Sequence, residues 1–303
     1  MKRRDFNRSL ALLPLGAALT AVPTTSLAAR KIPWQNWSGS QRSTPAGRIS
    51  PKTEDELANL LKNATGTVRP VGAGHSFSPL VPTEGTILST RHFNQVEPLD
   101  GHRAVVGAGV QLNRLGEPLH KMGQALPNMP DIDEQTVAGA LSTGTHGTGA
   151  NFGAMHDYVD ALRLVTPRGE VLDCSRSQNP DIFDAARVSL GSLGVITQYT
   201  LRNTAPYKLK RRTWMQPLEQ TFEEFHTLAE THRNFEMYYI PHSENALIIT
   251  TDLSDEAISP RGEDGDNDAV RELKMLRDYA SWWPWLRKKL ITGVSNTIPP
   301  EEH

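Results

Sequence analysis

The alternation of apolar and polar residues predicts a chain of many short strands with few helices. Residues 50–64 predict a helix, because leucines recur at helical spacing and Ser50 followed by Pro51 suits its first turn. Residues 112–126 predict a second helix that ends before a proline. Strands are predicted at residues 67–71, 85–93 and 102–110, and a hairpin at residues 160–174.

A turn-forming segment at residues 203–207 separates this region from a second patterned one. Residues 211–232 predict a strand followed by a helix, and residues 235–253 predict two strands around a turn. The second region is therefore expected to be a β-α-β-β unit with an antiparallel sheet. Because strands and helices mix without strict βαβ alternation, the whole chain favours an α+β fold over a doubly wound parallel sheet.

Two sets of residues in the second region, both with aromatic side chains among them, are predicted to serve packing. Glu236, Tyr238 and Tyr239 lie on one predicted strand, where their alternation suits half-buried packing better than a substrate site. The tryptophans of residues 282–289 are expected to pack a helix.

Composition narrows the class of protein. The chain has 303 residues, 38% hydrophobic and 22% charged, which suits one large or two medium globular domains. A formal net charge of −2 gives no sign of a nucleic-acid partner. Cys174 is the only cysteine, so an internal disulfide and a cysteine-based zinc site are excluded. An acidic segment resembles the start of a calcium-binding loop through Asp264, Asp266 and Asp268. The glycine and the glutamate that such a loop needs are missing, so a solvated loop is predicted.

The first 28 residues have the layout of an export signal. A basic start is followed by an apolar stretch and small residues before Arg30. Arg3 and Arg4 resemble a twin-arginine signal, which predicts export of a folded protein to the periplasm. Two alternatives stay open, a general secretory signal and a retained anchor. The apolar stretch is shorter than the roughly 20 residues that span a bilayer, so no stable membrane insertion is expected after cleavage.

Three stretches rich in glycine carry the candidate chemistry: "VGAGHSFS" (71–78), "TVAGALSTGTHGTGANFG" (136–153) and "VSLGSLGVITQYTL" (188–201). The first lacks the third glycine of a dinucleotide fingerprint and the lysine of a P-loop. Its exposed backbone N–H groups still suit phosphate oxygens. The second offers hydroxyl groups and close backbone approach, which suit a flat ligand. Each stretch alone is a weak signal.

Together, in this order, the stretches resemble a known family. "RPVGAGHSFSPL", "EQTVAGALSTGTHGTG" and "SLGSLGVIT" are similar to the FAD-binding domain of the vanillyl-alcohol oxidase (PCMH-type) flavoproteins. The resemblance spans about residues 35–250 and is strongest to the sugar-1,4-lactone oxidases and alditol oxidases. It implies a two-subdomain FAD-binding domain at residues 35–205 and an antiparallel-sheet substrate (cap) domain at residues 206–303. The cap is expected to be incomplete, because the family's later segment with its "HWGK"-like motif is missing from this sequence.

The resemblance also implies roles for individual residues. Gly72 to Ser76 would surround the FAD pyrophosphate, and His75 would bind the flavin covalently. The alternative for His75 is a turn histidine bonded to its own loop, and His146 would brace the second stretch rather than bind zinc with His156. The implied cofactor-binding residues are Val71, Gly72, Ala73, Gly74, His75, Ser76, Thr136, Gly139, Ser142, Gly144, Thr145, His146, Gly147 and Ile196.

The activity implied is oxidation of a hydroxyl carbon of a sugar lactone or polyol by hydride transfer to the flavin, with oxygen reduced to hydrogen peroxide. In the family a small residue before the "EQT" segment controls oxygen access, and Pro130 at this position favours an oxidase. A dehydrogenase that uses a cytochrome or quinone, and a non-catalytic FAD-binding remnant, stay open. No catalytic base and no metal site are assigned.

Overall fold

The computed structural model describes residues 32–259, 275, 278, 282–296 and 298–302. The expected export signal at residues 1–28 lies outside the described residues, as do Asp264, Asp266 and Asp268 of the acidic loop. In the described part of the chain, every helix is too short or too polar to cross a membrane.

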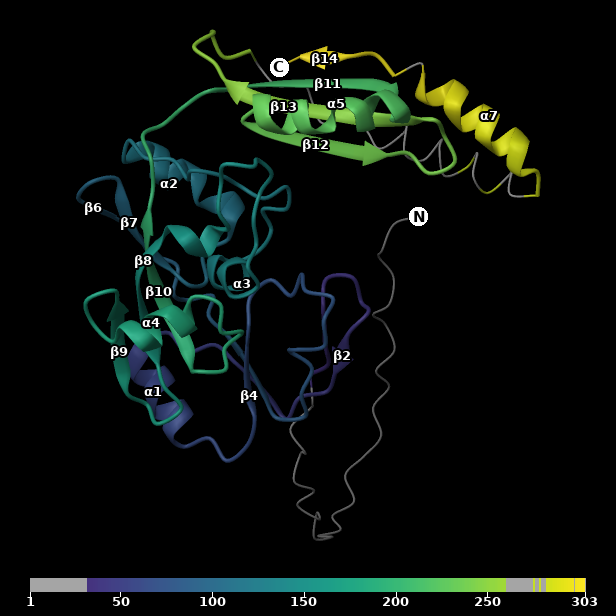
Figure 1. Ribbon diagram of the computed structural model, residues 1–303. Helices are drawn as coiled ribbons and strands as arrows, with labels where there is room; N and C mark the ends of the chain where they lie inside the picture. The colour runs from purple at the N-terminus through teal and green to yellow at the C-terminus, as the bar shows by residue number, and fades with distance from the viewer. Residues whose placement is uncertain (1–31, 260–274, 276–277, 279–281, 297, 303) are drawn as a thin grey trace, which may run out of the picture. The chain divides into compact units, whose positions relative to one another are not determined.

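A small parallel sheet and an N-terminal hairpin begin the fold. The sheet has the order β3-β5-β4, and the hairpin pairs β1 with β2 antiparallel. Their bounds are β1 (Trp34–Gln35), β2 (Arg42–Ser43), β3 (Gly47–Ile49), β4 (Val68–Val71) and β5 (Thr86–Ser89). The connection between β3 and β4 contains helix α1 (Glu54–Lys62), which is drawn in purple in Figure 1.

Helix α1 begins later than the sequence predicts. Its N-cap is Thr53 and not Ser50, because Thr53 Oγ1 accepts a hydrogen bond from the Glu56 N–H at 3.1 Å. The Glu56 carboxylate in turn accepts from the backbone N–H of Lys52 at 2.8 Å, which completes a variant of the capping box. Leu57 is fully buried, as the helical spacing of the leucines predicts.

A five-stranded antiparallel sheet forms the second subdomain, with the order β6-β7-β10-β8-β9. Its strands are β6 (Val96–Leu99), β7 (Arg103–Gly107), β8 (Val159–Val165), β9 (Val171–Ser175) and β10 (Val195–Arg202). The helices of this region are η1 (Leu112–Arg114), α2 (Gly116–Lys121), α3 (Val137–Ser142), η2 (Met155–Tyr158) and α4 (Pro180–Ala186). Strands β8 and β9 form the predicted hairpin, and Tyr199, Phe183 and Leu141 are fully buried in the core beside the sheet.

The helix predicted over residues 112–126 is only partly correct. It begins with a 3₁₀ turn, and α2 ends at Lys121. The chain then turns at Gly123, whose φ of +69° is left-handed, and Ala125 forms backbone hydrogen bonds with Thr204. A tertiary pairing therefore replaces the last helical turn.

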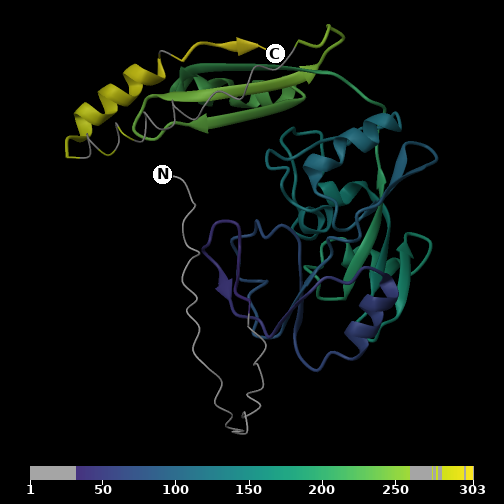
Figure 2. The ribbon, with the colours of Figure 1, turned by 180° about the vertical axis from the view of Figure 1, so that it is seen from behind.

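The region after β10 forms the expected β-α-β-β unit, the cap sheet. It consists of β11 (Leu209–Pro217), α5 (Leu218–Thr231), β12 (Asn234–Tyr239) and β13 (Asn245–Leu253), followed by α7 (Pro284–Ser295) and β14 (Glu301–Glu302). The strand order is β12-β13-β11-β14, all antiparallel, with α5 against one face (Figures 1 and 2). One expectation is wrong: Trp282, Trp283 and Trp285 do not pack the helix but are 87%, 60% and 68% exposed.

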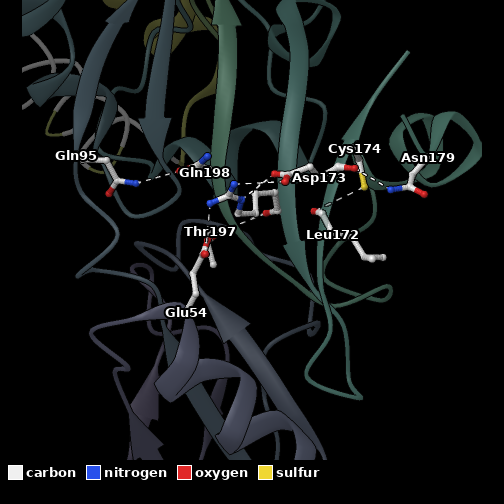
Figure 3. A network of polar contacts seen from close by, with 9 residues as sticks. Glu54, Gln95, Leu172, Asp173, Cys174, Asn179, Thr197 and Gln198 are labelled. Atoms are coloured by element: carbon white, nitrogen blue, oxygen red, sulfur yellow. Dashed lines mark hydrogen bonds and ion pairs between the residues drawn. The ribbon is translucent and has the colours of Figure 1, made fainter. Parts of the chain in front are cut away.

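A polar network joins α1 to the antiparallel sheet (Figure 3). Thr197 Oγ1, on β10, donates to Glu54 Oε1 at 2.6 Å. The Arg163 guanidinium, on β8, lies 3.5 Å from the Glu54 carboxylate and donates to Asp173 Oδ1 of β9 at 2.8 Å. This network connects α1, which belongs to the parallel sheet, to strands β8, β9 and β10 of the antiparallel sheet.

Candidate functional site

The three glycine-rich stretches meet around one cavity of about 400 Å³. Ten of the predicted cofactor-binding residues line it: Val71, Gly72, Ala73, Gly74, His75, Ser76, Thr136, Gly139, Ser142 and Ile196. Segments that are more than 100 positions apart in the sequence therefore line the same cavity.

The first stretch follows strand β4 directly, so the end of that strand fixes where the turn lies. Gly74 has a φ of +73°, a left-handed conformation that favours glycine. Gly72 lies directly against the side chain of Thr136, and a Cβ added to it would come within 2.0 Å of Thr136 Oγ1. The turn therefore needs glycine at both positions. Gly74 adopts the left-handed backbone conformation, and Gly72 leaves room for the Thr136 side chain.

The second stretch contributes helix α3 and its cap. Thr136 is the N-cap, and its Oγ1 accepts from the Gly139 N–H at 3.2 Å. Val137, Ala140 and Leu141 are buried in the core, so the helix turns Ala138, Gly139 and Ser142 toward the cavity. This small-residue face leaves room for a bulky ligand.

The third stretch supplies a turn and the start of β10. Gly194 has a φ of +147°, and a Cβ there would lie 2.4 Å from the Val165 carbonyl oxygen. Behind the turn, Tyr199 is fully buried and lines the cavity. Burial raises the pKa of the Tyr199 hydroxyl, which has no hydrogen-bond partner among the described residues. The Tyr199 hydroxyl is therefore neutral.

The remaining predicted residues lie outside the cavity lining: Gly144, Thr145, His146, Gly147 and Pro130. Thr145 accepts a hydrogen bond at 3.2 Å from Gln135, which does line the cavity. His146 is exposed, and its Nδ1 contacts the carbonyl oxygen of Gly147 at 2.9 Å. A Cβ on Gly147 would lie 2.1 Å from the Met129 carbonyl oxygen, so this loop packs directly against the residue before Pro130.

Several lining residues were not predicted from the sequence. Tyr199 and Leu190 lie within the third stretch, where the glycines could have drawn attention to them. Phe77 and Leu80 lie shortly after His75 in the sequence and add apolar walls. Trp37 does not line the cavity but stacks on His75, and its sequence context "QNWSG" carries no signal of this contact.

The lining contains no Asp, Glu, Lys or Arg, and His75 and Tyr199 are its ionisable groups. A second cavity of similar volume adds Arg91 and Arg114. It shares five lining residues with the first: Val71, Gly72, Ala73, Thr90 and Thr136. A cavity with apolar walls, hydroxyl groups and close backbone approach, beside a cationic neighbour, fits a flat aromatic cofactor that carries phosphate groups. Among the described residues, no group of three or more His, Cys, Asp or Glu is placed to hold a metal ion.

Comparisons with known proteins agree with this chemistry. Residues 45–175 match the family model of the FAD binding domain, and residues 199–296 match that of D-arabinono-1,4-lactone oxidase. An L-gulono-1,4-lactone dehydrogenase of Mycobacterium tuberculosis is 37% identical over 232 residues, covering 75% of this chain and 54% of the relative. A putative D-arabinono-1,4-lactone oxidase of Neurospora crassa is 32% identical over 275 residues, covering 88% and 48%. The chain thus spans about half the length of these relatives.

The fold is also similar to a solved structure. Cholesterol oxidase from Brevibacterium sterolicum superposes with a TM-score of 0.69 at 19% identity, covering 90% of this chain and 60% of that one. This likeness concerns the fold alone. The sequence matches show that the chain belongs to the PCMH-type FAD-binding flavoprotein family, in its sugar lactone oxidase branch.

Proposed function

We propose that the chain binds FAD in the cavity formed by the three glycine-rich stretches and belongs to an enzyme that oxidises a hydroxyl carbon of a sugar lactone or polyol. The convergence of these stretches on one neutral cavity carries the proposal. FAD held there would supply the redox chemistry, as a hydride acceptor for the substrate and an electron donor for a second molecule. The lactone-oxidising relatives support the substrate class.

The chain's own residues bind and orient the cofactor. The turn at Gly72 and Gly74 offers backbone N–H groups to the phosphates. Ser142 lines the cavity and offers a neutral hydroxyl group. His75 lines the cavity and is proposed as the covalent attachment point of the flavin.

We propose oxygen as the acceptor, with hydrogen peroxide as its product. Support comes from Pro130, a small residue before the "EQT" segment. The alternative is a dehydrogenase that passes electrons to a cytochrome or quinone, and one relative named above is called a dehydrogenase. Rapid reoxidation of the reduced protein in air supports the oxidase; slow reoxidation in air with rapid reaction with a dye acceptor contradicts it.

Export to the periplasm is proposed as well, on the basic and apolar pattern of residues 1–28. Replacement of Arg3 and Arg4 by lysine is expected to leave the protein in the cytoplasm if a twin-arginine signal operates. Unchanged export of this variant contradicts the twin-arginine signal.

The first experiment asks whether flavin is bound and how. The full chain is expressed with riboflavin, denatured in acid and separated by gel electrophoresis, with His75→Ala beside it. Flavin fluorescence on the wild-type band alone supports covalent attachment at His75. Flavin released from both proteins contradicts attachment but supports FAD binding, and no flavin in either contradicts the proposed function. Turnover in a screen of lactones and polyols contradicts the idea of a non-catalytic remnant.

A further inference from the structure

The imidazole of His75 lies between the cavity and an aromatic ring. The ring of Trp37 stacks on that of His75, with centroids 5.2 Å apart and planes inclined by 20°. His75 lines the cavity, whereas Trp37 does not and is 68% exposed. The indole therefore covers a part of the imidazole that the cavity leaves free.

Trp37 belongs to the N-terminal hairpin, which holds the backbone on both sides of His75. The Trp37 N–H donates to the Gly74 carbonyl oxygen at 2.8 Å. Asn36, which is 3% exposed, donates through Nδ2 to the Ser76 carbonyl oxygen at 3.0 Å. In both views the purple hairpin lies beside the blue segment that follows β4 (Figures 1 and 2).

A further hydrogen bond holds the next residue along the chain, Phe77. Gln41 Nε2 donates to the Phe77 carbonyl oxygen at 3.1 Å, and Asn36 Oδ1 accepts from the Gln41 N–H at 3.0 Å. Asn36 thus connects the inside of the hairpin to the His75 turn. Hydrogen bonds between the hairpin and the His75 turn therefore fix the position of Trp37. The stacking of the Trp37 ring on His75 is a further contact between the same two segments.

A histidine in a glycine turn can otherwise rotate about both side-chain torsions. An aromatic stack changes the population of one orientation by about two- to tenfold. Reaction of an imidazole nitrogen with a bound ligand depends on that orientation, because the reacting atoms must be held in line and close together. An aromatic ring that holds the His75 imidazole in one orientation therefore raises the rate at which His75 reacts.

We propose that Trp37 is a positioning residue that holds the His75 ring for attachment to the flavin. This inference rests on the proposed attachment at His75. In that step a bond forms between an imidazole nitrogen and the 8α-carbon of the flavin, while one C–H bond of that carbon and the imidazole N–H bond break. Molecular oxygen takes up the two electrons and two protons and leaves as hydrogen peroxide, so the flavin ends in its oxidised form.

The test compares three variants of the full chain. Trp37→Phe keeps a flat ring, and Trp37→Leu keeps an apolar side chain without one. Trp285→Leu is the matched control, because Trp285 is equally exposed, at 68%, and lies in α7. Flavin-free protein from riboflavin-starved cells receives FAD, and fluorescence on the denatured band is followed with time. We expect attachment to be about two- to tenfold slower in Trp37→Leu and close to wild type in the other two.

A second measurement needs no flavin. With histidine labelled isotopically, the ring protons of His75 in the flavin-free chain are assigned by their loss in His75→Gln. Because Trp37 stacks on this ring, we expect an upfield shift that persists in Trp37→Phe and disappears in Trp37→Leu. Binding of FAD without attachment is measured in the His75→Ala background, where replacement of Trp37 by leucine is expected to leave affinity unchanged.

Each outcome decides the inference. Equal attachment rates in wild type and Trp37→Leu overturn it. A slowdown matched by an equal loss of FAD affinity or by a lower melting temperature also overturns it, because Trp37 would then only support the fold. Wild-type protein that binds FAD without any covalent product overturns the attachment at His75, and the positioning role with it, while FAD binding stands.

Discussion

Gly72 and Thr136 lie so close together that a Cβ on residue 72 would come within 2.0 Å of Thr136 Oγ1. The two residues belong to different glycine-rich stretches, and their contact joins two walls of the cavity. We expect Gly72→Ala to force these walls apart, to destabilise the protein by about 1–3 kcal/mol and to lower its flavin content. Urea unfolding and the flavin-to-protein absorbance ratio measure both effects.

The same pair offers a compensation test. Thr136→Ala removes Oγ1, although it also removes the cap of α3 at a cost of about 1 kcal/mol. The double variant Gly72→Ala/Thr136→Ala is therefore expected to be more stable than the sum of the single effects predicts. Strict additivity would mean that the strain of Gly72→Ala lies elsewhere.

The contact between Thr197 and Glu54 is expected to stabilise the fold without serving the cavity. Thr197 is 1% exposed, and Thr197→Val keeps its shape while removing the donor to Glu54. We expect a loss of about 1–3 kcal/mol in unfolding free energy with unchanged flavin content. Thr200→Val, at a partly exposed position of the same strand, is the control. Equal unfolding midpoints for the two variants would contradict the prediction.

Arg233 connects β12 to the FAD-binding part of the chain through its planar guanidinium. The group lies 4.4 Å from the centroid of Phe152 and 4.7 Å from that of Tyr207, and it donates to the Pro127 carbonyl oxygen at 2.6 Å. Lysine cannot reproduce this stacked geometry, so Arg233→Lys is expected to lose about 1–2 kcal/mol. Thermal unfolding measures the loss, and the exposed Arg211→Lys should show none.

Asp252 predicts a dependence of stability on pH. Burial alone raises the pKa of Asp252, but hydrogen bonds from the Arg233 N–H at 2.9 Å and with His232 at 2.6 Å outweigh it and lower that pKa. Ionised Asp252 therefore stabilises the fold above about pH 4, and its contribution is lost as the pH falls through the lowered value. Because its side chain is 42% exposed, the effect should stay below about 1 kcal/mol.

The measurement is urea unfolding of wild type and Asp252→Asn between neutral and acid pH. Wild type should be the more stable protein at pH 7, and the difference should shrink toward pH 3. A difference that stays constant over this range would show that the carboxylate charge is not its source.

What the sequence predicts well in this protein depends on local chemistry. Gly74 and Gly194 are recognisable because their backbone conformations favour glycine, and the hairpin of β8 and β9 follows from alternation around a turn. The cavity walls were therefore predictable as segments. The start of α1 was not, because Ser50 and Thr53 are both good caps and the choice depends on the Glu56 carboxylate.

Contacts between distant segments escaped prediction. Nothing in the sequence near Trp37 indicates that its ring lies on His75, since the hydrogen bonds that place it come from the fold of the hairpin. The early end of α2 likewise depends on the pairing of Ala125 with Thr204. The exposure of Trp282 and Trp285 depends on which surfaces face the helix, which periodicity does not reveal.

The spacing of the cavity walls along the chain determines when they can form. Gly72 must wait for Thr136 before its turn has a partner, and Tyr199, which also lines the cavity, is made later still. Contacts of such long range are slow to form, and proteins are made at about 5–20 residues per second from the N-terminus. While Tyr199 is still inside the ribosome, the growing chain therefore cannot complete the cavity. Binding of the cofactor has to follow the synthesis of this part of the chain.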